Sequence, residues 1–225
     1  MQRKQRFKNE ILTETRCINS IIRFYSLSTL NEHKEGMNWY SEAHVYCKEL
    51  ADRFDITVQQ VAGIIAAFSP QTGWIENKRY TVSFLLTPNN RLRSLIQILK
   101  AKKILTLKSE ADIYVSLSVN GTAWKTKAFF LNILNPDIET DTTIDRHAIA
   151  VCIQSPGSVN ALPKKHGNLK RRQYEFFRQC YIKAAHKVGI FPHQLQAITW
   201  IVYRRLRELK EHNNLTEWKP FHTEF

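Results

Sequence analysis

The chain has 225 residues, 43% of them hydrophobic, and carries 33 Lys and Arg against 20 Asp and Glu, a formal net charge of +13. This length buries a substantial core, and five Trp, eight Tyr and twelve Phe exclude a disordered tail. The basic excess favours a polyanionic partner, and the dispersal of the cations along the chain argues against a membrane-binding amphipathic helix.

The sequence carries no sign of export or of a metal centre. No apolar segment follows the basic residues 1–8, and the apolar run 61–68 is too short to span a bilayer. The four cysteines form no C-x-x-C pair, which argues against zinc and iron–sulfur sites and predicts reduced, buried thiols. We expect an intracellular protein of the cytoplasm or nucleoid, with no cofactor, no metal and no membrane partner.

Apolar residues recur at helical spacing along most of the chain, while no strand pattern or internal repeat stands out. The first predicted helix covers residues 11–27. The polar segment 31–38, which contains Gly36, predicts a loop, and residues 39–54 predict a second helix. The fold class that follows is all-α.

The central and C-terminal parts continue the helical pattern. Thr57 has the position of an N-cap for a buried helix over 58–68. Further helices are predicted over 74–86, 91–103, 111–117, 124–134, 144–153, 174–188 and 192–209, with loops at 135–142 and 155–172. In the helix over 91–103, Leu92, Leu95, Ile96 and Leu99 share one apolar face.

The segment Gly121-Thr-Ala-Trp-Lys-Thr-Lys-Ala combines a tight turn with the start of an apolar helix. Gly121 permits the turn, and Ala123 is small enough for a phosphate backbone to approach closely. Lys125 and Thr126 follow at the helix start, where backbone N–H groups are available to a phosphate.

Two other segments carry polar groups that suit the same chemistry. Thr143-Ile-Asp145-Arg-His147 sets a carboxylate about twenty residues after Lys125, and an amine with a nearby carboxylate suits attack at a sugar carbon. Upstream, Phe68-Ser-Pro-Gln71-Thr-Gly-Trp-Ile-Glu-Asn77-Lys78 joins two predicted helices. The three segments together suggest chemistry on DNA.

These three segments resemble the helix-hairpin-helix DNA glycosylases, the superfamily of endonuclease III and 8-oxoguanine glycosylase. Its hairpin has the pattern Leu-Pro-Gly-Val-Gly-x-Lys-Thr-Ala, of which Gly121, Lys125 and Thr126 match and Ala123 replaces the second glycine. Its catalytic carboxylate lies in a Val-Asp-x-His segment, and a Leu-Ser-x-Gln-Thr segment supplies a glutamine that fills the hole left by the extruded base. The resemblance spans about residues 61–152.

The resemblance implies a two-lobe helical bundle, with one lobe over 39–134, a second combining 1–38 with 135–225, and the active cleft between them. Lys125 would attack the anomeric carbon of a flipped nucleotide and form a Schiff base that permits strand cleavage. Asp145 would stabilise the developing positive charge. The expected partner is double-stranded DNA with a damaged or modified base, bound by a monomer without a cofactor.

Other residues are expected at the DNA-facing surface or beside the catalytic pair. The expected DNA contacts are Gln71, Trp74, Gly121, Ala123, Thr126, Lys164 and Lys165, and the supporting residues are Asn77, Lys127 and His147. Lys127 lies about 200° round the helix from Lys125 and is its rival as the nucleophile. Asp145 could equally serve as the N-cap of the helix that follows.

Two other functions remain open from the sequence. One is a DNA-binding module that keeps the hairpin without turnover. The other, which we rank lower, is a metal-dependent nuclease, for which the acidic residues Asp137, Glu139 and Asp141 would be the ligands. Their spacing does not place them on one helix face, so a solvated loop is the simpler interpretation.

Overall fold

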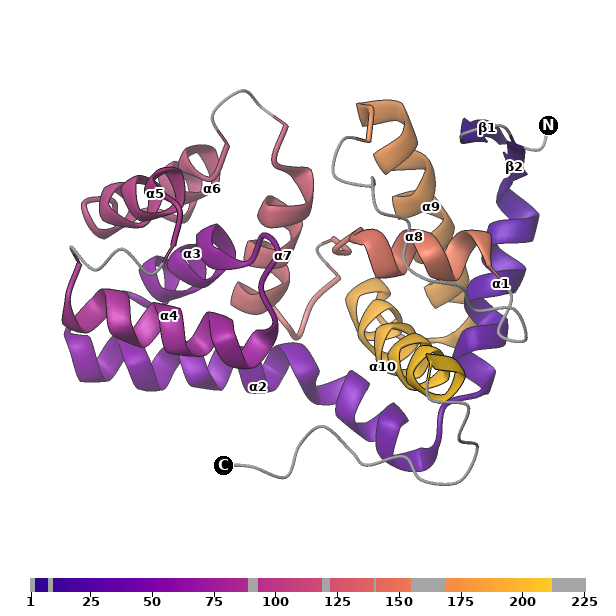
Figure 1. The fold of residues 1–225 in the computed structure, drawn as a ribbon, viewed down its shortest axis with the longest axis horizontal. Coiled ribbons are helices and arrows are strands. Elements are labelled where there is room, and N and C mark those ends of the chain that lie inside the picture. The colour runs from indigo at the N-terminus through magenta and orange to yellow at the C-terminus, as the bar shows by residue number, and fades with distance from the viewer. Residues whose placement is uncertain are drawn as a thin grey trace. The chain divides into compact units, whose positions relative to one another are not determined.

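The computed structural model describes residues 3–7, 10–88, 93–118, 122–139, 141–154 and 169–211. Within these residues it contains ten α-helices and one small antiparallel sheet, which confirms the all-α class (Figure 1). The elements are β1 (Lys4–Phe7), β2 (Glu10–Thr13), α1 (Glu14–Ser26), α2 (Leu30–Phe54), α3 (Val58–Phe68), α4 (Trp74–Leu86), α5 (Leu95–Leu105), α6 (Glu110–Ser116), α7 (Trp124–Leu134), α8 (Arg146–Ile153), α9 (Arg171–Val188) and α10 (Pro192–Glu211).

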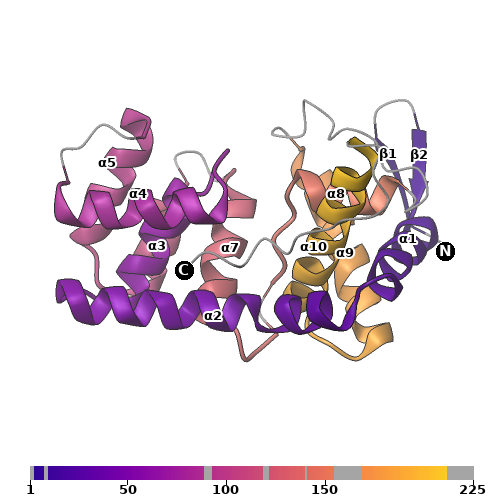
Figure 2. The same ribbon diagram turned by 60° about the horizontal axis from the view of Figure 1, so that its bottom comes forward.

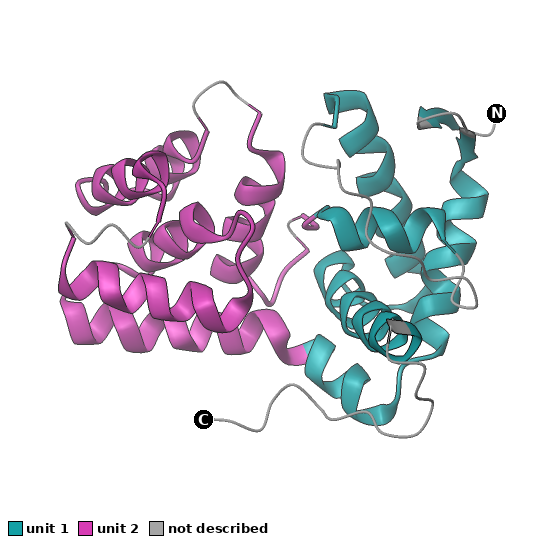
Figure 3. Ribbon diagram, viewed as in Figure 1, with its two compact units in different colours: residues 1–37, 144–225 teal, residues 38–143 magenta. Residues whose placement is uncertain are grey.

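The chain forms two compact units (Figure 3). Unit 1 combines residues 1–37 with 144–225, and unit 2 holds residues 38–143. Both boundaries differ slightly from the expected lobes: the division falls before Asn38 rather than Trp39, and after Thr143 rather than Leu134.

The core of unit 2 is α3, which packs against α4, α5, α6 and α7 (Figure 1). Every residue from Gln60 to Phe68 is buried, as a helix that is apolar nearly all round requires. The predicted N-cap is confirmed, because Thr57 Oγ1 accepts a hydrogen bond from Gln60 N and the Gln60 side chain accepts one from Thr57 N.

The apolar face predicted for the helix over 91–103 does not enter the core. Ser94 caps the helix, which begins at Leu95, and the buried side chains are Ile98, Ala101 and Ile104. Leu95, Ile96 and Leu99 are 54–70% exposed, and Leu92 lies outside the described residues. The face of α5 that packs into the core is therefore a different face from the one that the sequence predicted.

In unit 1, α1 packs against α8, α9 and α10. Cys17, Cys152 and Cys180, one from each of α1, α8 and α9, are buried in this core as free thiols. Burial raises the pKa of Cys152 well above its ordinary value, and raises that of Cys47 in unit 2 to about 12. The expectation of buried cysteines is confirmed.

The N-terminal residues correct the expectation of a chain without strands. Leu12 is 1% exposed while Ile11 is 65% exposed, so alternate residues of β2 face the core and the solvent. Thr13 then caps α1 by accepting from Arg16 N, and the first helix begins at Glu14 rather than at residue 11. Figure 2 displays β1 and β2 beside the start of α1.

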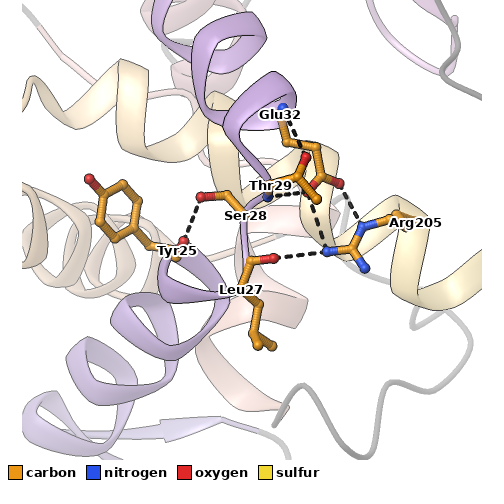
Figure 4. A network of polar contacts seen from close by, with 6 residues as sticks. All are labelled: Tyr25, Leu27, Ser28, Thr29, Glu32 and Arg205. Carbon is orange, nitrogen blue, oxygen red and sulfur yellow. Dashed lines mark hydrogen bonds and ion pairs between the residues drawn. The ribbon is translucent and has the colours of Figure 1, made fainter.

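The segment expected to be a loop at 31–38 is helical and belongs to α2. Thr29 Oγ1 accepts from Glu32 N and Glu32 Oε2 accepts from Thr29 N, so the two residues form a capping box. Arg205 of α10 binds the Glu32 carboxylate, which is 0% exposed, at 2.7 Å and donates to the Leu27 carbonyl (Figure 4).

Gly36 allows α2 to meet α10 closely. A Cβ at this position would lie 2.4 Å from Ile198 Cγ1 and 2.7 Å from the Ile198 backbone. The glycine therefore marks a helix–helix contact, and its usual cost inside a helix is offset by packing that a larger residue could not make.

Candidate active site

Lys125 lies in the first turn of α7, and the structure separates it from Lys127. The Lys127 Nζ stands 4.4 Å from the ring centre of Tyr114 of α6, a cation–π arrangement. Because two residues turn an α-helix by about 200°, Lys125 faces another direction. Within the described residues the Lys125 amine has no hydrogen-bond or ion-pair partner.

The face of α7 that carries Lys125 is directed towards α2. Phe129 and Asn132 follow Lys125 at i+4 and i+7, on the same side of the helix. The Phe129 ring lies 5.9 Å from that of Trp39 and 6.2 Å from that of Tyr40. Lys125 therefore stands one helical turn from a set of aromatic rings.

Those rings form a cluster, which we call the aromatic cluster: Trp39, Tyr40, Tyr46, Trp74 and Phe129. Ring centres are 4.7 Å apart between Trp39 and Tyr40, 5.1 Å between Trp39 and Trp74, and 6.1 Å between Tyr46 and Trp74. Tyr40 is buried, and the other four rings are partly exposed. The cluster thus includes Trp74, which the sequence analysis expects among the DNA contacts, and its rings offer surfaces on which a base could stack.

Lys78 of α4 covers one edge of the aromatic cluster. Its Nζ lies 5.3 Å from the Tyr46 ring centre and 5.8 Å from that of Trp74. Burial raises the pKa of Tyr46 to about 12, so the phenol is neutral at physiological pH and the contact is cation–π in kind. Tyr46 and Lys78, together with Arg79 and Leu86 of α4, line a shallow groove between α2 and α4.

Gln71 occupies an exposed turn between α3 and α4 in a left-handed backbone conformation, with φ of 59°. Residues other than glycine rarely adopt this backbone conformation. It marks positions whose geometry is imposed by their surroundings. Arg93 contacts this turn by donating from Nη2 to the Phe68 carbonyl at 3.2 Å and the Pro70 carbonyl at 2.8 Å. Thr72 Oγ1 donates to the same two carbonyls.

The other residues expected at the DNA surface fall in different places. Ala123 is the N-cap of α7 and provides no side-chain acceptor for the first turn, and Thr126 is half-buried. Asn77 is 2% exposed, and its Nδ2 donates to the Ile65 carbonyl, so its role is inside unit 2. Gly121, Lys164 and Lys165 lie outside the described residues.

Asp145 belongs to unit 1, where it is the N-cap of α8. Its Oδ1 accepts from the backbone N–H groups of His147 and Ala148 at 2.9 and 2.8 Å, and its Oδ2 lies 3.0 Å from His147 Nδ1. The His147 ring packs edge-on against Trp200 and Tyr203 of α10. The carboxylate is thus oriented by three donors, and 14% of its side chain remains exposed.

The structure also bears on the expectations about metal ligands and membrane spans. Asp137 and Glu139 are exposed, and Asp141 Oδ1 accepts from Thr142 N. In the described part of the chain no three His, Cys, Asp or Glu side chains gather as metal ligands. None of the described helices combines the length and apolar character needed to cross a membrane.

Sequence reasoning missed three residues of this arrangement. Phe129 and Asn132 stand at i+4 and i+7 from Lys125, a spacing that could have identified them. Arg93 had no such signal, because it reaches the turn at Gln71 only through the fold.

Comparison with known proteins gives one match. The model of a family with the description "Family of unknown function (DUF7178)" matches residues 3–207. No curated protein and no solved structure matches the chain.

Proposed function

We propose that this chain, which belongs to the family of unknown function DUF7178, is a DNA glycosylase with lyase activity that removes a damaged or modified base. The observation that carries the proposal is the position of Lys125. Its amine has no partner among the described residues and stands one helical turn from the partly exposed aromatic cluster. An available amine beside stacking surfaces suits covalent chemistry on an unstacked nucleotide.

The reaction begins when the Lys125 Nζ, in its neutral form, attacks C1′ of the flipped nucleotide. The C1′–N bond breaks, and the base leaves with the electron pair and takes up a proton. Loss of a proton from the amine and opening of the sugar ring give a Schiff base. Loss of a proton from C2′ then expels the 3′ phosphate by β-elimination.

Asp145 supplies the second group. A carboxylate stabilises the positive charge that develops on the sugar as the base departs. The three donors around Asp145 hold the carboxylate in one orientation. Because Lys125 and Asp145 belong to different units, the proposal also requires that both act on the same nucleotide.

Gln71 is assigned to the space that the flipped base vacates in the duplex. Its exposed, left-handed turn is braced by Arg93, so the amide projects from a fixed backbone. Gly73 and Ala123, the N-caps of α4 and α7, offer no side-chain acceptor, which leaves the first N–H groups of both helices available to phosphates.

Borohydride trapping tests the proposal on duplexes that carry different damaged or modified bases, with an abasic duplex as the reference. We expect a covalent protein–DNA adduct with the wild type and with Lys127→Ala, and none with Lys125→Ala. Lys127→Ala is the matched control, because it removes a neighbouring amine from the same helix. Loss of the adduct in Lys127→Ala alone would shift the nucleophile by two residues.

The second candidate is a DNA-binding protein without turnover. The observation that favours it is that Asp145 already has a structural role as the cap of α8, which needs no catalysis. Salt-sensitive binding without an adduct or base release on any duplex would select this function over the first.

A further inference from the structure

The positive charge of the protein is concentrated in unit 1. This unit has 21 Lys and Arg against 10 Asp and Glu, a net charge of +11, whereas unit 2 has 12 against 10, a net charge of +2. The aromatic cluster and Lys125 belong to the nearly neutral unit. The groups that would hold a polyanion by charge therefore lie mostly elsewhere.

Part of this charge gathers where the β-hairpin meets α9. Gln173, in the first turn of α9, donates from Nε2 to the Arg6 carbonyl at 3.3 Å. Six exposed cations lie along residues 3–6 and at residues 170–172, where α9 starts: Arg3, Lys4, Arg6, Lys170, Arg171 and Arg172. We call them the hairpin patch.

The sheet geometry explains why the hairpin presents cations. Lys4 pairs with Thr13, and Arg6 pairs with the exposed Ile11, so both basic side chains lie on the solvent face. Leu12 fills the opposite face and is buried. Residues two apart in a strand are separated by about 6.7 Å. Lys4 and Arg6 therefore present two charges at this spacing on the same face of the hairpin.

No acidic side chain neutralises the patch among the described residues. None of its six cations has an ion-pair partner there. Two acids that follow these segments in the chain pair with other cations, Glu14 with Lys183 at 2.8 Å and Glu175 with Arg178 at 3.2 Å. Lys170, the N-cap of α9, forms no side-chain cap, so the helix dipole adds to the positive field.

We propose that the hairpin patch is a second contact surface for DNA, which binds the phosphate backbone of a duplex independently of its sequence. The choice of duplex DNA rests on the proposed function, but the contact needs no base removal. An anionic membrane fits less well. Among the hairpin and α9 side chains whose exposure is described, Ile11 is the single large apolar group that is mostly exposed, and membrane attachment uses a broad apolar face.

The test is the salt dependence of binding to an unmodified duplex of about 25 base pairs, measured by fluorescence anisotropy between about 50 and 200 mM KCl. Two double variants remove charge from the patch, Lys4→Gln with Arg6→Gln, and Arg171→Gln with Arg172→Gln. The matched control, Lys103→Gln with Lys108→Gln, removes two exposed cations from unit 2. Thermal melts check that each variant remains folded.

Each phosphate contact contributes about 0.9 to the slope of log affinity against log salt. We therefore expect each patch variant to lower the slope by about 1.8 and to weaken binding by roughly one to two orders of magnitude near 0.1 M salt. The control should keep the wild-type slope. Patch variants that behave like the control would overturn the proposal.

Other outcomes reject the proposal in distinguishable ways. Wild-type protein that binds no duplex at low salt would remove the proposed function together with the patch. Normal wild-type binding with unchanged patch variants would reject the patch alone. Co-sedimentation with phosphatidylserine vesicles that the patch variants lose, while their DNA slope is unchanged, would assign the surface to a membrane instead.

Discussion

Asn132 of α7 donates from Nδ2 to Thr143 Oγ1 at 3.2 Å, in a part of unit 2 where both residues are buried. The Tyr40 hydroxyl donates to the same oxygen at 3.2 Å. The helix that carries Lys125 is thereby tied to the last residue of unit 2, and Asp145 follows two residues later. These two hydrogen bonds hold Thr143, which precedes the proposed carboxylate by two residues.

Asn132→Ala should lower the free energy of unfolding by about 1–3 kcal/mol, because it removes a buried hydrogen bond and leaves a cavity. Urea denaturation measures the loss. Asn38→Ala, at an exposed position of α2, is the control and should be neutral or slightly stabilising. Equal values for the two variants would mean that the contact with Thr143 contributes nothing.

Asp145→Asn and Asp145→Ala should separate capping from catalysis. Asn caps a helix about as well as Asp, so its cost in stability should be small, whereas Ala should cost about 1–2 kcal/mol. Both remove the charge, and we expect both to slow base release by roughly a hundredfold or more in single-turnover assays. Full activity of the Asn variant would leave Asp145 with the capping role alone.

Gln71→Gly should relieve the left-handed backbone and raise the free energy of unfolding by about 0.5–1 kcal/mol. Gln71→Ala is the matched variant, since it keeps the strain and also lacks the amide. Both should release a base more slowly from duplex DNA than the wild type. Equal thermal stability of the two variants would show that the turn stores no strain.

Gly36→Ala should destabilise unit 1 by about 1–3 kcal/mol, because the added Cβ would meet Ile198 at 2.4 Å. Gly73→Ser provides the contrast. A Cβ at Gly73 meets nothing within 4 Å, and serine is a favoured N-cap for α4, so this variant should be neutral or stabilising. Thermal melts of both proteins decide whether close packing or backbone freedom selects glycine at position 36.

Arg205→Ala should lower stability by about 3–5 kcal/mol, since it leaves the fully buried Glu32 carboxylate without its guanidinium partner. Arg79→Ala removes a partner from the exposed Glu76 and should change stability by less than about 1 kcal/mol. Adding Glu32→Gln to Arg205→Ala should restore part of the loss. A loss that is unchanged by Glu32→Gln would contradict the burial argument.

Local signals predicted several elements at their observed bounds. The helices over 74–86 and 124–134 begin and end where the apolar spacing placed them, and Thr57 caps α3 as expected. Asp145 is the N-cap of α8, which was one of the two roles that the sequence left open. Helix caps and apolar periodicity depend on residues a few positions apart, so they can be recognised in the sequence without knowledge of the fold.

Distant contacts decided the elements that were wrong. The polar segment 31–38 is helical, and its contacts come from α10, more than 150 residues away. Arg205 binds the Glu32 carboxylate, and Ile198 packs closely against Gly36. The β-hairpin likewise depends on a tertiary contact, because the Leu12 side chain is buried in the core of unit 1. The apolar residues on α5 gave no sign of which face would be covered, because two faces of the helix were apolar enough to serve.

By itself, the amino-acid sequence determined the helical class, the helix caps, the buried thiols and the basic charge, because each depends on residue type and local spacing. Only the tertiary structure decided which lysine of α7 stands near the aromatic cluster, how Arg93 braces Gln71, and where the exposed cations gather. These depend on side chains from separate helices meeting in space, and the order of residues along one chain does not specify such meetings in advance.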